Sequence, residues 1–290
     1  MYAAGNGGSC SHLRKVKAMS SDREVKKMVQ EKYGAIALQS KADAQESCCG
    51  SSCGCSPGFE FTVMAEDYKN LPGYVPEADL ALGCGLPTQH AMLKAGDTVV
   101  DLGSGAGNDC FVARSIVGAS GRVIGIDMTE AMVGKARVNA TKLGYDNVEF
   151  RLGDIENVPL EANVADVLVS NCVMNLVPDK KRAFAETFRI IKPGGHFSIS
   201  DIVLKGRLPE AVRQEAALYA GCISGALEKE EYLAAIEGAG FVEVRVQKER
   251  RIDVPQEIFE RYLTREQLRD LQTSNVGIFS ITVFARKPRP

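Results

Sequence analysis

The sequence predicts an α/β fold in which helices cover both faces of a parallel sheet. From about residue 97 onward, short apolar runs alternate with helical patterns, and this alternation is typical of parallel strands joined by helices. A glycine-rich turn follows the first apolar run, at the point where a helix would begin. Hydrophobic residues make up 45% and charged residues 25% of the 290 residues, so the chain carries enough apolar material for a sizeable core.

The expected strands and helices alternate along this part of the chain. Strands are expected at 98–102, 122–127, 148–152, 165–170 and 196–203. Helices are expected from the glycine-rich turn to residue 117, from the capping residue Thr129 to the terminating Gly144, and at 179–191. The segment KPGG at 192–195 is expected to form a turn before the fifth strand.

Three regions are expected along the chain. Residues 1–58 combine a flexible arm, a helix at 21–33 and a cysteine-rich loop at 47–58, residues 59–204 form the core, and residues 205–290 form a smaller C-terminal lobe. In that lobe, helices are expected at 209–227 and 229–238, and antiparallel strands at 241–248 and 279–286.

Charge and hydropathy exclude several classes of partner. The 35 Lys and Arg residues nearly balance the 37 Asp and Glu residues, whereas a nucleic-acid-binding protein would show a basic excess. The sequence contains no run of about 18 apolar residues, so no membrane span is expected. The first residues, MYAAGNGGSCSHLRK, lack the apolar core of a signal peptide, and a cytoplasmic location is therefore expected.

The glycine-rich turn after the first strand reads D-x-G-x-G-x-G over residues 101–107. Glycines in such a turn let the backbone approach a ligand at a helix N-terminus. A dinucleotide fingerprint would place glycine at 108, where Asn108 stands, so NAD and FAD are disfavoured. The motif instead resembles the first motif of class I S-adenosylmethionine methyltransferases. The competing interpretation is a tight turn that binds nothing.

The resemblance to class I methyltransferases assigns roles to residues further along the chain. Asp127 closes the second strand, where a carboxylate can accept both ribose hydroxyls of an adenosyl group, although it could instead cap a helix. Asp154 and Ile155 stand at the position that contacts adenine, and Asn171 ends the fourth strand beside the region of methyl transfer. The residues assigned to S-adenosylmethionine are Asp101, Gly103, Ser104, Gly105, Asp127, Met128, Asp154, Ile155 and Asn171.

Nine cysteines are the unusual feature of the composition. In a reducing compartment, such thiols bind a soft ion, react or lie buried rather than form a disulfide framework. Cys172 directly follows the fourth strand, and the topology of an open α/β sheet therefore places it at the mouth of the site. Spacing alone does not bring Cys84 or Cys222 to that point, and each could be a buried core residue, as is favoured for Cys110.

Several segments, four of which bear a cysteine, resemble the arsenite methyltransferase family over about residues 20–250. The segments are YVPEADLALGCGLP, DLGSGAGNDC, GIDM, SNCVMNLVPDK and LYAGCISGAL. The resemblance implies a doubly wound, Rossmann-like sheet of seven mostly parallel strands, with an S-adenosylmethionine-binding core at 59–204. It also implies that Cys84, Cys172 and Cys222 are the catalytic residues and hold trivalent arsenic, or As(III), as thiolates. The arsenic lone pair would attack the sulfonium methyl group, and no general base would be required.

Four further cysteines, at 48, 49, 53 and 55, lie close together in the N-terminal region. They include one C-x3-C pair but no second pair, so a zinc site is disfavoured and redox exchange or arsenic capture is preferred. The family carries an N-terminal thiol that joins a disulfide during turnover, and Cys49 and Cys55 are both candidates. A thiol reductant such as thioredoxin or glutathione would then regenerate the enzyme. The competing interpretation is a mobile tail with incidental thiols.

The expected activity is therefore transfer of methyl groups from S-adenosylmethionine to arsenite, a detoxification reaction whose substrates are arsenite and methylated arsenicals. Two other functions compete with it. The first is a methyltransferase that acts on a small organic acceptor, with structural thiols. The second is a non-enzymatic, thiol-rich protein that binds a metalloid, which would have no need of Asp127 or Asp154. The sequence carries no signal of an oligomeric state, and a monomer is compatible with it.

Overall fold

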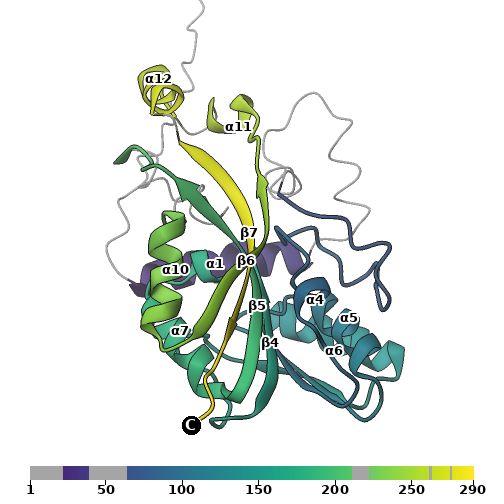
Figure 1. Cartoon of the computed structure of the whole chain (residues 1–290). Coiled ribbons are helices and arrows are strands. Elements are labelled where there is room, and N and C mark those ends of the chain that lie inside the picture. Colours follow the sequence, from purple (N-terminus) through teal and green to yellow (C-terminus); the bar gives the residue numbers. More distant parts are fainter. Residues whose placement is uncertain (1–21, 39–63, 211–221, 224, 261–262, 275) are drawn as a thin grey trace, which may run out of the picture.

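One seven-stranded sheet forms the centre of the molecule, with strand order β3-β2-β1-β4-β5-β7-β6 (Figure 1). The computed structural model describes residues 22–38, 64–210, 222–223, 225–260, 263–274 and 276–290. The strands are β1 (Thr98–Leu102), β2 (Arg122–Asp127), β3 (Val148–Leu152), β4 (Ala165–Asn171), β5 (Ile191–Lys205), β6 (Val242–Arg251) and β7 (Gly277–Arg286).

The sheet is mostly parallel, as the sequence predicts. The five strands β3, β2, β1, β4 and β5 are neighbours in that order, and each adjacent pair is parallel. Strand β7 runs antiparallel to both β5 and β6. The late strands β6 and β7 therefore extend the same sheet as the core, while the limits of the three expected regions stay a prediction.

Helices cover both faces of the sheet. The described helices are α1 (Asp22–Leu38), α4 (Pro87–His90), α5 (Asn108–Val117), α6 (Glu130–Leu143), α7 (Lys180–Ile190), α10 (Lys229–Gly238), α11 (Gln256–Glu260) and α12 (Arg265–Thr273), with a 3₁₀ turn η1 (Met174–Leu176). Alternate β1 residues face opposite ways, because Val100 packs with α7 and α10 while Val99 packs with α5 and α6. The doubly wound α/β architecture is thus confirmed.

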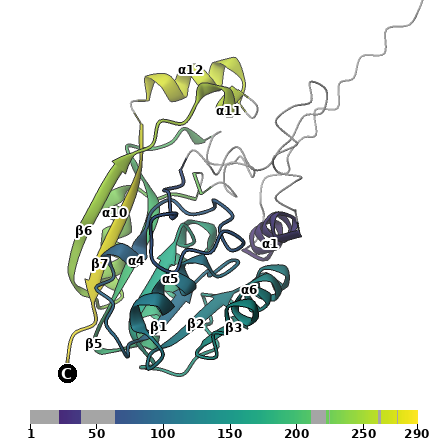
Figure 2. The ribbon, with the colours of Figure 1, turned by 90° about the vertical axis from the view of Figure 1, so that its right-hand side faces the viewer.

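Helix α1 lies over the carboxyl ends of the central strands and beside α6 (Figure 2). Val25 and Val29 pack into a cluster that also contains Cys84, Cys172 and Cys222. Further along the helix, Ile36 and Ala37 pack against Met132 of α6. These four apolar residues are therefore buried, and the helix continues five residues beyond the predicted end at Tyr33.

Three local features differ from the expectations or were not foreseen. The KPGG segment lies inside β5, where the pairing shifts from Ala165–Ile191 to Val167–His196, so these residues form a bulge in the strand rather than a separate turn. Thr129 is the N-cap residue of α6, but its side chain makes no capping hydrogen bond. Helices α11 and α12, which lie beyond one end of β6 and β7 (Figure 1), were not expected.

Two expectations reach into parts of the chain that the structure does not describe. Of the helix expected at 209–227, residues 211–221 lie outside the described residues, and Cys222 occupies a turn. The cysteines at 10, 48, 49, 53 and 55 also lie outside them. Within the described segments, no helix combines the length and the apolar character needed to cross a bilayer.

Candidate functional site

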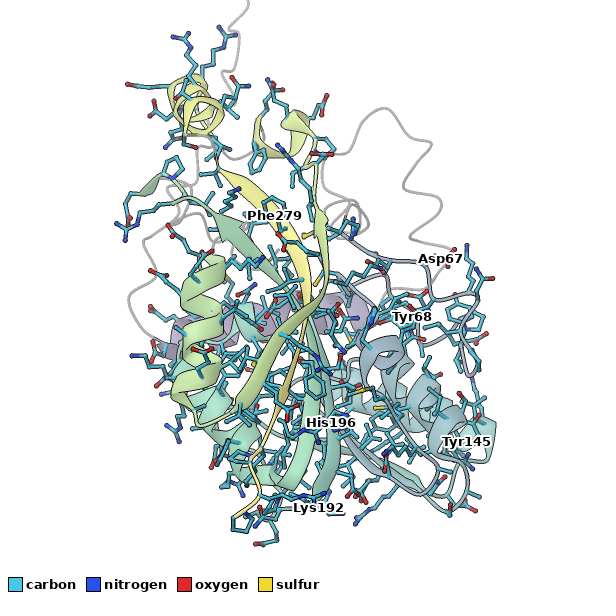
Figure 3. All side chains as sticks on the ribbon, in the orientation of Figure 1. Asp67, Tyr68, Tyr145, Lys192, His196 and Phe279 are labelled. Carbon is cyan, nitrogen blue, oxygen red and sulfur yellow. The ribbon has the colours of Figure 1, made fainter. Side chains whose placement is uncertain are left out.

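A pocket opens at the carboxyl ends of β1, β2 and β4, the edge at which open α/β sheets bind ligands. Its empty volume is about 1130 Å³, part of which is open solvent. Helix α1 and the segment 65–83 form its outer wall. Tyr68, on that segment, lies toward the end of the sheet where β4 stops, whereas His196 and Lys192 lie nearer the opposite end (Figure 3).

The nine residues predicted to bind the cofactor all line this pocket. They are Asp101, Gly103, Ser104, Gly105, Asp127, Met128, Asp154, Ile155 and Asn171. Among the described cysteines, Cys172 lines it as well, while Cys84 and Cys222 lie in the adjoining buried cluster. The hydroxyl of Ser104 and the amide oxygen of Asn108 are buried at the pocket and have no hydrogen-bond partner among the described residues.

The glycine-rich turn is fixed by backbone hydrogen bonds to the end of β2. The amides of Gly103 and Ser104 donate to the carbonyl of Ile126, at 2.7 and 3.0 Å. Gly103 and Gly105 both have positive φ, at 75° and 52°. A Cβ at Gly103 would lie 2.3 Å from the side chain of Val173, whereas a Cβ at Gly105 would meet nothing within 4 Å. Gly105 therefore leaves open space at the pocket.

The Asp127 carboxylate connects the glycine-rich turn to α6. Its two oxygens accept the backbone amides of Gly105 and Thr129, each at 2.9 Å. Burial raises the pKa of Asp127 above its ordinary value, and the two amides act in the opposite direction by stabilising the carboxylate. Each oxygen keeps a lone pair that can accept a further hydrogen bond.

Helix α1 is attached to the loop after β3 by an ion pair that the sequence did not reveal. Lys26 donates to the Asp154 carboxylate at 2.6 Å and also contacts the Glu156 carboxylate. The second Asp154 oxygen accepts the Glu156 amide at 2.9 Å. This ion pair joins residues that are 128 positions apart, so no local pattern could indicate it.

The Asn171 side chain binds protein groups on both of its polar atoms. Its oxygen accepts the backbone amides of Cys84 and Gly85 at 3.0 and 3.3 Å, and its nitrogen donates to the Gly85 carbonyl at 2.8 Å. The nitrogen also contacts the hydroxyl of Tyr68. A Cβ at Gly83 would lie 2.5 Å from the Asn171 nitrogen, so the close approach of this loop requires glycine.

Two of the residues that line the pocket carry buried carboxyl groups. The Asp109 carboxyl accepts the hydroxyls of Tyr68 and Thr88, at 2.8 and 3.3 Å, and burial raises its pKa to about 6. The Asp101 carboxyl accepts the thiol of Cys110 at 3.3 Å, and burial also raises its pKa. Cys110 is fully buried, which fits the core position expected for it.

Three thiols from distant parts of the chain meet beyond the end of β4. The thiol of Cys172 interacts with the thiols of both Cys84 and Cys222. The Cys222 thiol also donates to the Cys172 carbonyl at 3.2 Å. All three side chains are at least 96% buried. The other two thiols and burial raise the pKa of Cys172 well above its ordinary value, and burial raises that of Cys84.

The backbone at these cysteines is unusual. Cys172 and Cys222 have φ values of 61° and 64°, a region that residues other than glycine enter at a cost of about 1–2 kcal/mol. Cys84 stands between two glycines, and a Cβ at Gly85 would lie 2.5 Å from the hydroxyl of Ser200. Strain of this kind is concentrated at functional sites, because the surrounding structure must hold it in place.

Two further residues beside the thiols were missed by the sequence analysis. The carboxyl of Asp201, on β5, is fully buried, and one of its oxygens lies within 4.8 Å of the sulfurs of Cys84 and Cys172. Burial raises its pKa to about 7. Tyr33 of α1 donates a hydrogen bond to Cys222. A carboxylate inside the apolar strand 196–203 was the available signal for Asp201, because such a group is costly to bury without a purpose.

Comparisons with known proteins agree with this geometry. A family model described as a methyltransferase domain matches residues 93–240, about half of the chain. An arsenite methyltransferase of Rattus norvegicus is 31% identical over 255 residues, which cover 85% of this chain and 67% of the relative. The chain belongs to the arsenite methyltransferase family.

Other members of the arsenite methyltransferase family agree in sequence and in fold. The enzyme of Halobacterium salinarum is 40% identical over 243 residues, covering 79% of this chain and 61% of the relative. The crystal structure of an arsenic(III) S-adenosylmethionine methyltransferase from Chlamydomonas reinhardtii superposes with a TM-score of 0.58 at 28% identity, covering 89% of this chain and 73% of that one. This chain spans about three fifths of the length of the first curated relatives.

The two glycines of the turn allow a matched test of the packing. Gly103→Ala should lower the free energy of unfolding by about 2–5 kcal/mol, because the left-handed backbone and the clash with Val173 both oppose it. Gly105→Ala should lower it by about 1–2 kcal/mol, because only the backbone cost applies. Urea denaturation of both variants checks the difference, and equal losses would contradict the packing described here.

Proposed function

We propose that this chain transfers methyl groups from S-adenosylmethionine to trivalent arsenic held by Cys84, Cys172 and Cys222. The observation that carries the proposal is the meeting of three buried thiols at the edge of the pocket, in a member of the arsenite methyltransferase family. Soft thiolates are the expected ligands of a soft, thiophilic centre. A methyltransferase of organic acceptors would have no evident use for this convergence.

The pocket residues fit S-adenosylmethionine. When bound, this molecule supplies a methyl group activated by a sulfonium centre. The free lone pairs of Asp127 can accept the ribose hydroxyls, and Asp154 and Ile155 lie where the resemblance places the adenine ring. The unpartnered polar atoms of Ser104 and Asn108 are available for a polar part of the ligand. Asp101, Gly103, Gly105, Met128 and Asn171 complete the proposed cofactor site.

The chemistry of arsenite explains why three thiols are needed. Arsenious acid exchanges its three hydroxyl groups for three sulfurs, As(OH)₃ + 3 RSH → As(SR)₃ + 3 H₂O, and each thiol proton leaves in a water molecule. The product is trigonal pyramidal with a free lone pair, so no base is needed to generate the nucleophile. The task of the protein is then orientation, which contributes roughly 7–11 kcal/mol in well-aligned systems.

Regeneration of the enzyme requires electrons. In methyl transfer the arsenic lone pair would supply both electrons of a new As–C bond, the electrons of the C–S bond would leave with the donor sulfur, and arsenic would pass from the trivalent to the pentavalent state. Two thiols can return two electrons to arsenic by forming a disulfide. We propose that a thiol reductant, thioredoxin or glutathione, reduces this disulfide, and that Cys49 or Cys55 takes part in it.

Serine substitutions test the ligand assignment. Cys84→Ser, Cys172→Ser and Cys222→Ser should each reduce arsenite methylation by at least about a hundredfold, because a hydroxyl is a poor ligand for arsenic and even lost support of a metal ligand costs up to that factor. Binding of S-adenosylhomocysteine, measured by calorimetry, should stay within about threefold of the parent, because none of the three cysteines is among the residues assigned to the cofactor. Cys110→Ser is the matched control, because this buried thiol is directed at Asp101 and a serine hydroxyl can replace it. Activity near that of the parent in any of the three variants would contradict the assignment.

The raised pKa values of Cys84 and Cys172 predict how arsenite affinity depends on pH. A raised pKa keeps both groups as neutral thiols between pH 6 and 8, so their exchange with two hydroxyl groups of arsenious acid takes up and releases no net protons. The affinity measured by calorimetry should change by less than about twofold over this range. Asp201→Asn is the control, because it removes a neighbouring group that titrates near pH 7.

A fall in arsenite affinity of about tenfold per pH unit would contradict this account. It would mean that one thiol has a lowered pKa and is already a thiolate in the free protein. When a thiolate replaces a hydroxyl group of arsenious acid, one proton must be taken from solvent so that the hydroxide leaves as water.

A further inference from the structure

We propose that Cys84, Cys172 and Asp201 form a binding site for a thiophilic divalent cation, of which Cd²⁺ and Zn²⁺ are the representatives. One ligand atom from each residue lies within 4.8 Å of the other two, and all three side chains are buried. The site shares two sulfurs with the proposed arsenite site but adds a carboxylate oxygen. The inference does not rest on the proposed function, because a cation can bind here whatever the chain methylates.

The three ligands come from segments that the fold holds firmly. Asn171 positions the loop that bears Cys84, and the amide of Cys172 donates to the Ser200 carbonyl at 2.8 Å. Asp201 lies next to Ser200 on β5, so Cys172 and Asp201 are joined by the pairing of β4 with β5. A site built on strands keeps its ligands close to the geometry that an ion requires.

The hydrogen bonds of Asp201 leave it free to bind a cation. One of its oxygens accepts both the Asn175 amide and the Ile202 backbone amide, each at 2.9 Å. The other oxygen accepts only the Tyr232 hydroxyl, at 3.2 Å, among the described residues. That oxygen keeps a lone pair, and its partners hold the carboxylate in a fixed orientation, as the outer-shell groups of metal sites do.

Arsenite and a divalent cation require different charges in the site. Arsenite bound by three sulfurs is neutral and needs no carboxylate. A divalent cation with two thiolates and one carboxylate would carry a net charge of −1, which a buried site tolerates only with a compensating cation. Lys180 lies half-buried nearby, and its ammonium group interacts electrostatically with Asp201. The dication, its three anionic ligands and Lys180 therefore sum to zero.

Zinc and cadmium both accept sulfur and carboxylate oxygen in tetrahedral arrangements, and in such a site a neutral water molecule would take the fourth position. Because the sulfurs of Cys84 and Cys172 are shared, such a cation and arsenite cannot occupy the site together. The proposed consequence is that thiophilic cations compete with arsenite.

Cadmium titration of the full-length chain tests the site. The parent for this experiment carries serine at Cys10, Cys48, Cys49, Cys53 and Cys55, so that these thiols do not contribute. The thiolate-to-cadmium absorption should reach saturation at one equivalent of Cd²⁺. Asp201→Asn should weaken cadmium binding at least about tenfold while arsenite affinity changes by less than about threefold. Cys110→Ser is the matched control and should leave cadmium affinity unchanged.

Two results would overturn the inference. One is an Asp201→Asn variant that folds, as judged by circular dichroism, and binds Cd²⁺ as tightly as the parent. The other needs no Asp201 variant: the ¹¹³Cd NMR shift of the bound ion should lie in the range of mixed sulfur and oxygen ligands, and a shift typical of sulfur ligands alone would exclude the carboxylate. Neither result depends on methylation, so failure of this inference and failure of the proposed function are distinguishable.

Discussion

The amide of Asn171 joins the two parts of the site. On one side it contacts Tyr68, whose hydroxyl donates to the Asp109 carboxyl behind the glycine-rich turn. On the other side it binds the backbone of Cys84 and Gly85, and so holds the Cys84 thiol against Cys172 at the end of β4. The pocket and the thiol cluster therefore share one anchor, and the position of each fixes the position of the other.

Burial governs the chemistry of these groups. The thiols of Cys84 and Cys172 lie where water is excluded, and their pKa values rise because a low-dielectric environment opposes the thiolate form. Helix α1 contributes to this exclusion, since its apolar face packs on the cluster and its Lys26 binds Asp154. Neutral thiols suit arsenious acid, which exchanges hydroxide for sulfur without needing charge in the site, whereas a divalent cation requires the anionic ligand that Asp201 supplies.

The sequence was sufficient to predict the strands and the residues at their ends. It was insufficient to predict contacts between residues that are far apart in sequence. Short apolar runs located the strands of the core. Topology placed Cys172 at the mouth of the pocket, because it directly follows a strand and open α/β sheets bind ligands at the carboxyl ends of their strands. The meeting of Cys84 with Cys172 depends on contacts across 88 positions of sequence, and only the family resemblance indicated it. The bulge at 192–195 was missed because a Pro-Gly-Gly segment is equally compatible with a turn, and pairing with β4 decides between them.

The coordination of bound arsenic tests the central claim most directly. X-ray absorption spectroscopy at the arsenic edge, on the full-length chain loaded with one equivalent of arsenite, reports the atoms in the first coordination shell. The account predicts three sulfur neighbours and no oxygen. A shell with one or more oxygen neighbours, at full occupancy of the site, would contradict it, because the three thiols would then not act together on one arsenic atom.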